Sequence, residues 1–188
     1  MSMEQGPPAS IRSLLVLGGA RSGKSAYALK LAEAYSPERL YLATAAPGDE
    51  EMAARIARHQ AERGRGWTTL EEPLEVARTL GAEARSGRVI VVDCLTLWLS
   101  NLMLMGRDPG PGVAALADAI RALAGPAILI SNEVGMGIVP DHKLGREFRD
   151  WQGRANQEIA QACDAAILIA AGLPLRLKPA ATAGVQLG

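Results

Sequence analysis

Residues 18–25 of this chain are Gly18-Gly19-Ala20-Arg21-Ser22-Gly23-Lys24-Ser25, which match the phosphate-loop pattern G-x-x-x-x-G-K-[ST] at every fixed position. The apolar run Leu14-Leu15-Val16-Leu17 precedes the loop, and residues 26–33 after it have apolar side chains at helical spacing. Glycines let the backbone bend until its N–H groups converge on phosphate oxygens at the positive end of a helix. Lys24 adds a charge for the β- and γ-phosphates, and the Ser25 hydroxyl suits Mg²⁺. The stretch predicts a strand, a loop that binds a nucleoside triphosphate, and a helix.

The composition fits a compact enzyme. The chain has 188 residues, of which 48% are hydrophobic but only one is Phe, so the core must consist mainly of aliphatic side chains. Twenty basic and 20 acidic residues cancel, which argues against nucleic acid or an anionic membrane as a partner. Cys94 and Cys163 are too few for a disulfide framework, so we expect two small buried residues in a reducing compartment. Neither a signal peptide nor a membrane span is visible, and we therefore expect a cytoplasmic protein.

Strand and helix patterns alternate along the chain, which indicates an α/β fold built on a mostly parallel sheet. We expect a single catalytic domain over residues 11–178, with flexible ends at residues 1–10 and 179–188. The expected strands cover residues 13–17, 40–43, 67–70, 89–93, 127–131, 165–170 and 175–177. The expected helices cover residues 25–35, 49–63, 74–85, 95–105, 112–124 and 142–163. Because ligands of such sheets bind at the carboxyl ends of the strands, residues that follow strands are the candidates for a site.

Asp93 ends the apolar run Val89-Ile90-Val91-Val92. In phosphate-loop enzymes, an acid at the end of such a strand helps to hold the Mg²⁺ that the loop hydroxyl also contacts. The alternative is that Asp93 caps the helix that follows it. Together with the phosphate loop, the pattern favours a metal site made of Ser25 and Asp93.

His59 lies in the helix expected over residues 49–63, in which acids come early and bases late, as the helix dipole favours. The pattern alone predicts a surface histidine near the end of that helix. No sequence rule makes it catalytic.

Further motifs follow the phosphate loop in a fixed order. They are Leu40-Tyr41-Leu42-Ala43-Thr44, residues 49–56 with His59 and Trp67, Ser131-Asn132-Glu133-Val134-Gly135-Met136-Gly137-Ile138-Val139-Pro140, Phe148-Arg149-Asp150, and Gly153-Arg154-Ala155-Asn156-Gln157. Over about residues 13–178 the chain thereby resembles the bifunctional adenosylcobinamide kinase / adenosylcobinamide-phosphate guanylyltransferase family of cobalamin biosynthesis. The Asn-Glu-Val-Gly-x-Gly-Ile-Val-Pro stretch is its most specific motif. The resemblance implies a RecA-like phosphate-loop fold and a homotrimer.

The resemblance also implies two reactions. The family phosphorylates the hydroxyl of adenosylcobinamide with ATP or GTP, and then transfers GMP from GTP to adenosylcobinamide phosphate through a guanylyl-histidine. That histidine corresponds to His59, whereas His142, the only other histidine, is expected in the first turn of a helix. A neutral imidazole can attack the α-phosphorus of GTP. Lys24 and the phosphate loop would serve both reactions.

Other roles are likewise implied by the resemblance. Residues that look like nucleotide contacts are Thr44, Ala45, Ala46, Gln60, Ala61, Glu62, Arg63 and Glu71. A carboxylate at Glu71 suits the N1–H and N2–H₂ donors of guanine, although an exposed acid beside Glu72 remains the alternative. The substrate loop comprises Asn132, Glu133, Gly135 and Gly137. Glu133 either orients the hydroxyl acceptor or orders its own loop.

Two other functions remain open from the sequence. One is a phosphate-loop kinase for another small alcohol, with His59 in a structural role. The other is a nucleotide-dependent switch or a nucleic-acid motor of RecA type, against which stand the zero net charge and the small size.

Overall fold

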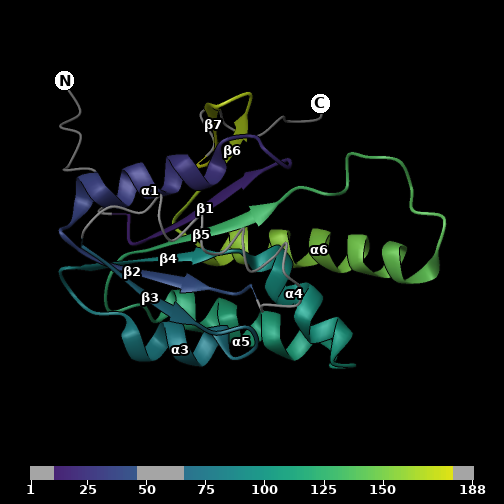
Figure 1. Ribbon diagram of the computed structural model, residues 1–188, viewed down its shortest axis with the longest axis horizontal. Coiled ribbons are helices and arrows are strands. Elements are labelled where there is room, and N and C mark those ends of the chain that lie inside the picture. Colours follow the sequence, from purple (N-terminus) through teal and green to yellow (C-terminus); the bar gives the residue numbers. More distant parts are fainter. Residues whose placement is uncertain (1–10, 46–65, 180–188) are drawn as a thin grey trace, which may run out of the picture.

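The computed structural model describes residues 11–45 and 66–179 of the chain (Figure 1). Within these ranges, strands and helices alternate along most of the chain, as the sequence patterns predicted. The flexible ends expected at residues 1–10 and 179–188, apart from Pro179, and the helix expected over residues 49–63 lie outside the described residues.

One seven-stranded sheet forms the centre of the molecule, with the strand order β3-β2-β4-β5-β1-β6-β7. Every neighbouring pair is parallel except β6 and β7, which are antiparallel. The expected α/β fold on a mostly parallel sheet is therefore confirmed. The strands are β1 (Ser13–Gly18), β2 (Glu38–Ala43), β3 (Trp67–Glu71), β4 (Arg88–Asp93), β5 (Ala127–Asn132), β6 (Ala165–Ala170) and β7 (Leu173–Lys178).

Helices cover both faces of the sheet (Figure 1). α1 (Lys24–Tyr35) packs on one face, where Val16, Val91 and Ile130 point toward its buried Ala28. Alternate strand residues point to the opposite face, because successive side chains of a strand alternate. That second face carries α3 (Val76–Glu83), α4 (Leu95–Leu104), α5 (Pro109–Arg121) and α6 (Lys143–Ala162).

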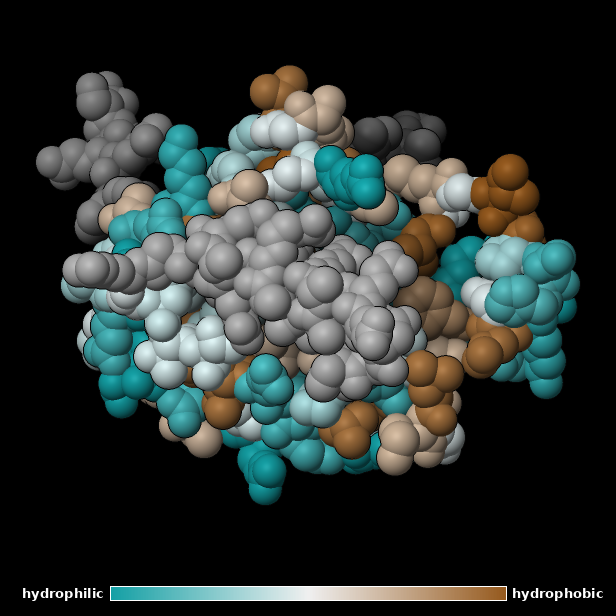
Figure 2. All heavy atoms as spheres, in the orientation of Figure 1, coloured by the Kyte–Doolittle hydropathy of each residue, from teal (hydrophilic) through white to brown (hydrophobic). Residues whose placement is uncertain are grey.

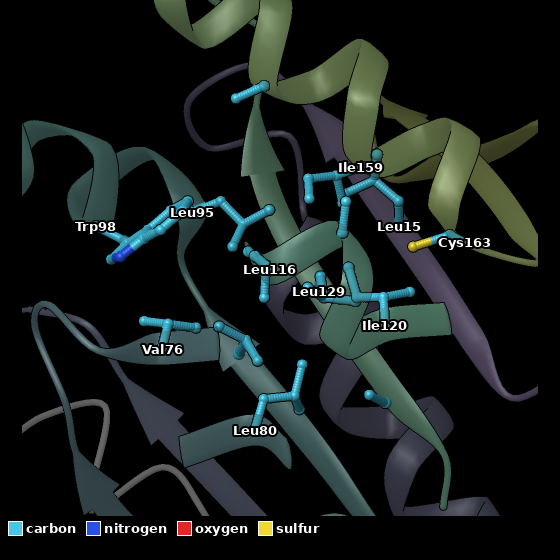
Figure 3. Close-up of a cluster of buried hydrophobic side chains, with 14 of the residues drawn as sticks. Leu15, Val76, Leu80, Leu95, Trp98, Leu116, Ile120, Leu129, Ile159 and Cys163 are labelled. Atoms are coloured by element: carbon cyan, nitrogen blue, oxygen red, sulfur yellow. The ribbon is translucent and has the colours of Figure 1, made fainter. Parts of the chain in front are cut away.

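The larger core lies between the sheet and the helices of the second face. Leu15 and Leu129 of neighbouring central strands meet Leu116 of α5 and Ile159 of α6 there (Figure 3). Trp98 of α4 is also buried, and its indole Nε1 donates to the carbonyl of Leu74 over 2.9 Å. The polar edge of this large ring is therefore satisfied without water. The buried core is mainly aliphatic, as the composition predicted.

The bounds of several segments differ from the sequence-based expectation by two or three residues, and two of these differences have a local cause. α5 begins at Pro109 rather than at residue 112, because the Asp108 side chain accepts from the Gly110 N–H over 3.0 Å and proline suits the first helical turn. The last strand runs over Leu173–Lys178 rather than residues 175–177. It pairs with β6 through a two-residue turn at Ala171 and Gly172, whose φ values of 51° and 80° are those of a tight hairpin turn.

Both cysteines are buried, as expected. Burial raises the pKa of the Cys94 thiol to about 11 and that of Cys163 to about 12. For Cys94 the neighbouring Asp93 carboxylate adds to the effect of burial. Neither thiol is therefore a nucleophile at neutral pH. Among the helices of the described segments, none has the length and hydrophobicity needed to cross a membrane.

Candidate active site

The sheet register brings the carboxyl ends of five strands into one row. Gly18 of β1 pairs with Asn132 of β5, and Asp93 of β4 pairs on one side with Ile130 of β5. On the other side Asp93 pairs with Ala43 of β2, whose further partner is Glu71 of β3. The described candidates at the strand ends, which are far apart in sequence, therefore share one edge of the sheet.

The phosphate loop turns sharply between β1 and α1. A Cβ atom on Gly18 would lie 2.5 Å from Ser22 Oγ and 2.6 Å from the carbonyl oxygen of Ile169, so only glycine fits there. Gly23 has φ 97°, in the left-handed region that favours glycine. Ala20 and Arg21 are exposed at the top of the turn, where the Ser22 N–H bonds back to the Gly19 carbonyl.

Lys24 is the first residue of α1 and its side chain folds over the loop. The ammonium Nζ donates to the Gly19 carbonyl over 2.9 Å, and the residue is only 8% exposed. Ser25 follows in the first helical turn and is half-buried. Free backbone N–H groups at a helix start and a lysine charge together form a site for phosphate oxygens.

The turn between β6 and β7 contacts the phosphate loop and supports it. The Gly172 N–H donates to the Ser22 carbonyl over 2.9 Å. A Cβ atom on Gly23 would lie 3.4 Å from Gly172 Cα. No sequence pattern predicts this contact. The dipeptide Ala171-Gly172 between two apolar strands is a hairpin signal, but nothing in it names the loop that it supports.

Asp93 does not cap α4, since the N-cap residue of that helix is Cys94 and no side chain caps it. The alternative role as a helix cap is therefore wrong. Tyr41 Oη instead donates to Asp93 Oδ2 over 2.8 Å, which leaves Oδ1 without a hydrogen-bond partner among the described residues. Carboxylate and hydroxyl oxygens, as on Asp93 and Ser25, are the donors that Mg²⁺ prefers.

No group of three or more His, Cys, Asp or Glu side chains that could hold a metal occurs in the described segments. Mg²⁺ is commonly bound by one or two protein ligands, with substrate phosphates and water completing its coordination.

Thr44 follows β2 and is fully buried. Its hydroxyl donates to the Cys94 carbonyl over 2.7 Å and accepts from the Cys94 N–H over 2.8 Å. Asn101 Nδ2 donates to the Thr44 carbonyl over 2.8 Å. The Thr44 side chain thus ties the ends of β2 and β4 together, and its predicted nucleotide contact stays a prediction, as does that of the half-buried Ala45.

Glu71 and Glu72 have different surroundings although they are neighbours. Burial raises the pKa of Glu72, but the N–H groups of Glu75 and Leu74 and the Thr79 hydroxyl outweigh it, and the net pKa is lowered. The Glu72 carboxylate thus binds the N–H groups of Leu74 and Glu75, just before α3. Glu71 is exposed at the end of the edge strand β3. Of the two carboxylates, Glu71 is the one open to a ligand.

The predicted substrate loop leaves the sheet at Asn132, beside the phosphate loop. The Glu133 N–H donates to the Gly18 carbonyl over 3.1 Å, and Glu133 Oε1 accepts from the Gly135 N–H over 2.9 Å. Beyond Gly135 the loop exposes Met136, Ile138 and Val139 by 82%, 98% and 60%. Figure 2 shows hydrophobic surface on the side of the molecule where this loop projects.

His142 is the N-cap residue of α6, where its Nδ1 accepts from the Gly145 N–H over 3.0 Å. This agrees with the expected place at the start of a helix. The other expected site residues lie outside the described part of the chain: Ala46, His59, Gln60, Ala61, Glu62 and Arg63.

The sheet order and the loop after β1 define a RecA-like phosphate-loop nucleotide-binding protein. Two solved structures have similar folds. The assembled ATPase EscN of the type III secretion system of enteropathogenic E. coli matches with a TM-score of 0.56 at 13% identity, over 86% of this chain and 43% of that chain. A prototypical ATPase of a type III secretion system of pathogenic bacteria matches with a TM-score of 0.52 at 11% identity, over 84% of this chain and 50% of that one. At such identities the likeness concerns the fold alone.

Residues 14–177 match the protein family described as CobU, cobinamide kinase / cobinamide phosphate guanyltransferase, and the chain belongs to this family. The bifunctional adenosylcobalamin biosynthesis protein CobP of Pseudomonas aeruginosa is 48% identical over 167 residues, which cover 87% of this chain and 96% of that protein. The corresponding CobU proteins of Escherichia coli and Salmonella typhimurium are 36% and 38% identical, each over 88% of this chain and 99% of the relative. The chain is thus a bifunctional kinase and guanylyltransferase. The family is neither of the two alternatives left open by the sequence.

Proposed function

We propose that the protein phosphorylates the hydroxyl of adenosylcobinamide with ATP or GTP, and then transfers GMP from GTP to the new phosphate through His59. The observation that carries the proposal is the register of Gly18 with Asn132 in a chain of this family. It sets the phosphate loop, which suits the donor triphosphate, beside the loop that we assign to the acceptor.

The kinase step requires a positioned γ-phosphate and neutralisation of its charge. In our proposal, the N–H groups of residues 18–25 and the Lys24 ammonium hold the triphosphate. Ser25 and Asp93 are the residues that would hold Mg²⁺, which supplies charge neutralisation on the phosphates when bound. Glu133, at the root of the neighbouring loop, would orient the acceptor hydroxyl and take its proton.

The second step requires a nucleophile at the α-phosphorus of GTP. A neutral imidazole nitrogen of His59 would form a bond to this phosphorus while the bond to pyrophosphate breaks. An oxygen of adenosylcobinamide phosphate would then attack the same phosphorus, and the imidazole would leave. His142, the other histidine, is already used through Nδ1 as the cap of α6. The residue contacts proposed for Glu71 and for Thr44, Ala45, Ala46 and residues 60–63 would hold the nucleotide during this transfer.

Labelling tests this function directly. The protein is incubated with GTP labelled at the α-phosphate, denatured and digested, and the labelled peptide is identified. We expect one labelled residue, His59, in a bond that resists alkali and breaks in acid, as a phosphoramidate does. Labelling should weaken below about pH 6, where an unperturbed histidine is mostly protonated.

The variant His59→Asn separates the two reactions. It should lose GMP transfer but still phosphorylate adenosylcobinamide, because the kinase step needs no imidazole. His142→Asn is the matched control and should keep both activities. Covalent GMP on His59→Asn, or its continued formation of the GDP-linked product, would disprove the mechanism.

We also propose that the protein assembles as a homotrimer, on the strength of its resemblance to the family. Light scattering on the purified chain would test this, since a trimer has three times the 19.8 kDa mass of one chain. A mass equal to one or two chains would contradict the proposal.

A further inference from the structure

The end of β5 lies where one of its two neighbouring strands has already stopped. The pairing of β4 with β5 ends at Asp93 and Ile130, two residues before β5 itself ends at Asn132. Because backbone groups of a strand alternate in direction, Asn132 points its N–H and carbonyl toward the side that β4 has left. Both groups need other partners, since an unpaired buried backbone group is costly.

Side chains from two different helices supply these partners. Thr96, in the first turn of α4, accepts from the Asn132 N–H through Oγ1 over 2.8 Å. Asn156 of α6 donates from Nδ2 to the Asn132 carbonyl over 3.0 Å. Thr96 and Asn156 therefore clamp the backbone of one residue, at the point where the chain leaves the sheet.

A buried polar network fixes the orientation of the Asn156 amide. Its Oδ1 accepts from Ser131 Oγ over 2.6 Å and from Gln152 Nε2 over 3.0 Å, so that Nδ2 is the atom that faces Asn132. Gln152 Nε2 also donates to Ser131 Oγ over 2.9 Å. Ser131, Gln152 and Asn156 are at most 5% exposed. The clamp thus has a single arrangement of donors and acceptors.

Stability alone does not explain this network. Gln152 Oε1 is buried and has no hydrogen-bond partner among the described residues. Apolar side chains of similar shape can replace buried hydrogen-bonded groups with little loss of stability. The hydrogen bonds of a buried polar network instead fix the geometry of the groups that they join, which matters where reacting groups must be placed accurately.

We propose that Thr96 and Asn156 are positioning residues for the phosphoryl acceptor. By holding both backbone groups of Asn132, they set the direction in which the loop with Glu133 leaves the sheet beside Gly18. The proposal rests on the proposed function, in which this loop orients the acceptor. It predicts that loss of the clamp impairs use of the acceptor while the phosphate loop still binds nucleotide normally.

Thr96 allows a matched pair of variants. Thr96→Val keeps the shape but leaves the Asn132 N–H without an acceptor, whereas Thr96→Ser keeps the hydroxyl. For Thr96→Val we expect kcat/KM for adenosylcobinamide to fall roughly tenfold, as for the loss of one positioning hydrogen bond, with the Kd for a non-hydrolysable GTP analogue unchanged within about twofold. Thr96→Ser should stay within about threefold of the wild type. Asn156→Asp, which turns the donor to Asn132 into an acceptor, should act in the same direction as Thr96→Val.

Hydrogen exchange separates this proposal from the proposed function. The amides of residues 133–137 should exchange faster in Thr96→Val than in Thr96→Ser, whichever alcohol the enzyme phosphorylates. A wild type that does not phosphorylate adenosylcobinamide would refute the proposed function and leave this comparison valid. Unchanged kcat/KM and exchange in Thr96→Val would overturn the clamp. A parallel loss of nucleotide affinity, or equal damage in Thr96→Ser, would overturn it as well.

Discussion

The phosphate loop and the loop after β5 start from neighbouring residues of the sheet but are built in opposite ways. In the phosphate loop, backbone contacts fix the chain: Gly18 has no room for a Cβ, and the Ser22 carbonyl bonds to the hairpin turn at Gly172. In the loop after β5, the root at Asn132 and Glu133 is held firmly, but Met136 and Ile138 are almost fully exposed. The first loop has a sequence pattern that many nucleotide-binding enzymes share, in which backbone groups recognise phosphate. The second presents exposed side chains of the motif by which the sequence most specifically resembles its family.

The largest effect should come from the charge in the phosphate loop. Lys24→Ala removes the ammonium that lies over Gly19, and we expect both activities to fall by at least about 10²–10³-fold, because in our proposal one triphosphate site serves both. Kinase assays and α-label transfer measure the two losses. Lys30→Ala, an exposed lysine of the same helix, is the control. Near-normal guanylylation in Lys24→Ala would mean that the GTP of the second reaction binds elsewhere.

Glu133→Gln tests whether the loop after β5 takes part in the chemistry. The amide oxygen can still accept from the Gly135 N–H, so the loop stays ordered, but the basic carboxylate is lost. We expect kcat of the kinase to fall about 10²-fold, as for loss of a general base. GMP transfer to a phosphate needs no such base and should change little. Exposed Glu147→Gln is the control, and a normal kinase in Glu133→Gln would leave this carboxylate only the role of ordering its loop.

Two neighbouring glycines test the backbone fit of the phosphate loop. Gly18→Ala puts a Cβ against Ser22 Oγ and the Ile169 carbonyl, and should cost about 1–3 kcal/mol of stability. Gly19→Ala meets nothing within 4 Å and should leave the melting temperature unchanged. Thermal unfolding measures both variants. Equal melting temperatures would show that the loop can shift to accept a side chain at Gly18.

The smallest effect on stability should come from a substitution at the tip of the loop after β5. Ile138 is 98% exposed, so Ile138→Ser should change the free energy of unfolding by no more than about 0.5 kcal/mol and leave nucleotide affinity unaltered. Denaturant unfolding and nucleotide titration check this result. A clearly lower stability would show that Ile138 packs against another part of the protein or another subunit in solution.

Local sequence patterns predicted the parts of the fold that local interactions determine. The phosphate loop, the strand before Asp93 and the helices that alternate with strands were all visible as motifs or as apolar periodicity. α5 begins three residues before the expected start, because the glycine- and proline-rich residues before position 112 are typical of a loop although Asp108 and Pro109 in fact begin the helix. Placement of the strand ends along one edge followed from the parallel topology alone.

The missed parts of the site depend on contacts between distant residues. Tyr41 meets Asp93 across 52 positions, Thr96 meets Asn132 across 36, and Asn156 meets Asn132 across 24. A tyrosine, a threonine and an asparagine in ordinary strands and helices carry no local sign of these partners. The motif that includes Asn156 pointed to the family, but only the packing of α6 against β5 shows what its amide contacts.

The hairpin behind the phosphate loop has a consequence for the order in which the protein matures. The loop precedes the turn at Gly172 in the sequence, so it is synthesised before the turn whose N–H holds the Ser22 carbonyl. A nascent chain that ends before Gly172 lacks this support for the phosphate loop. We therefore expect the nucleotide site, and the stabilisation that a bound ligand gives, to be complete only in chains whose synthesis has passed the turn between β6 and β7.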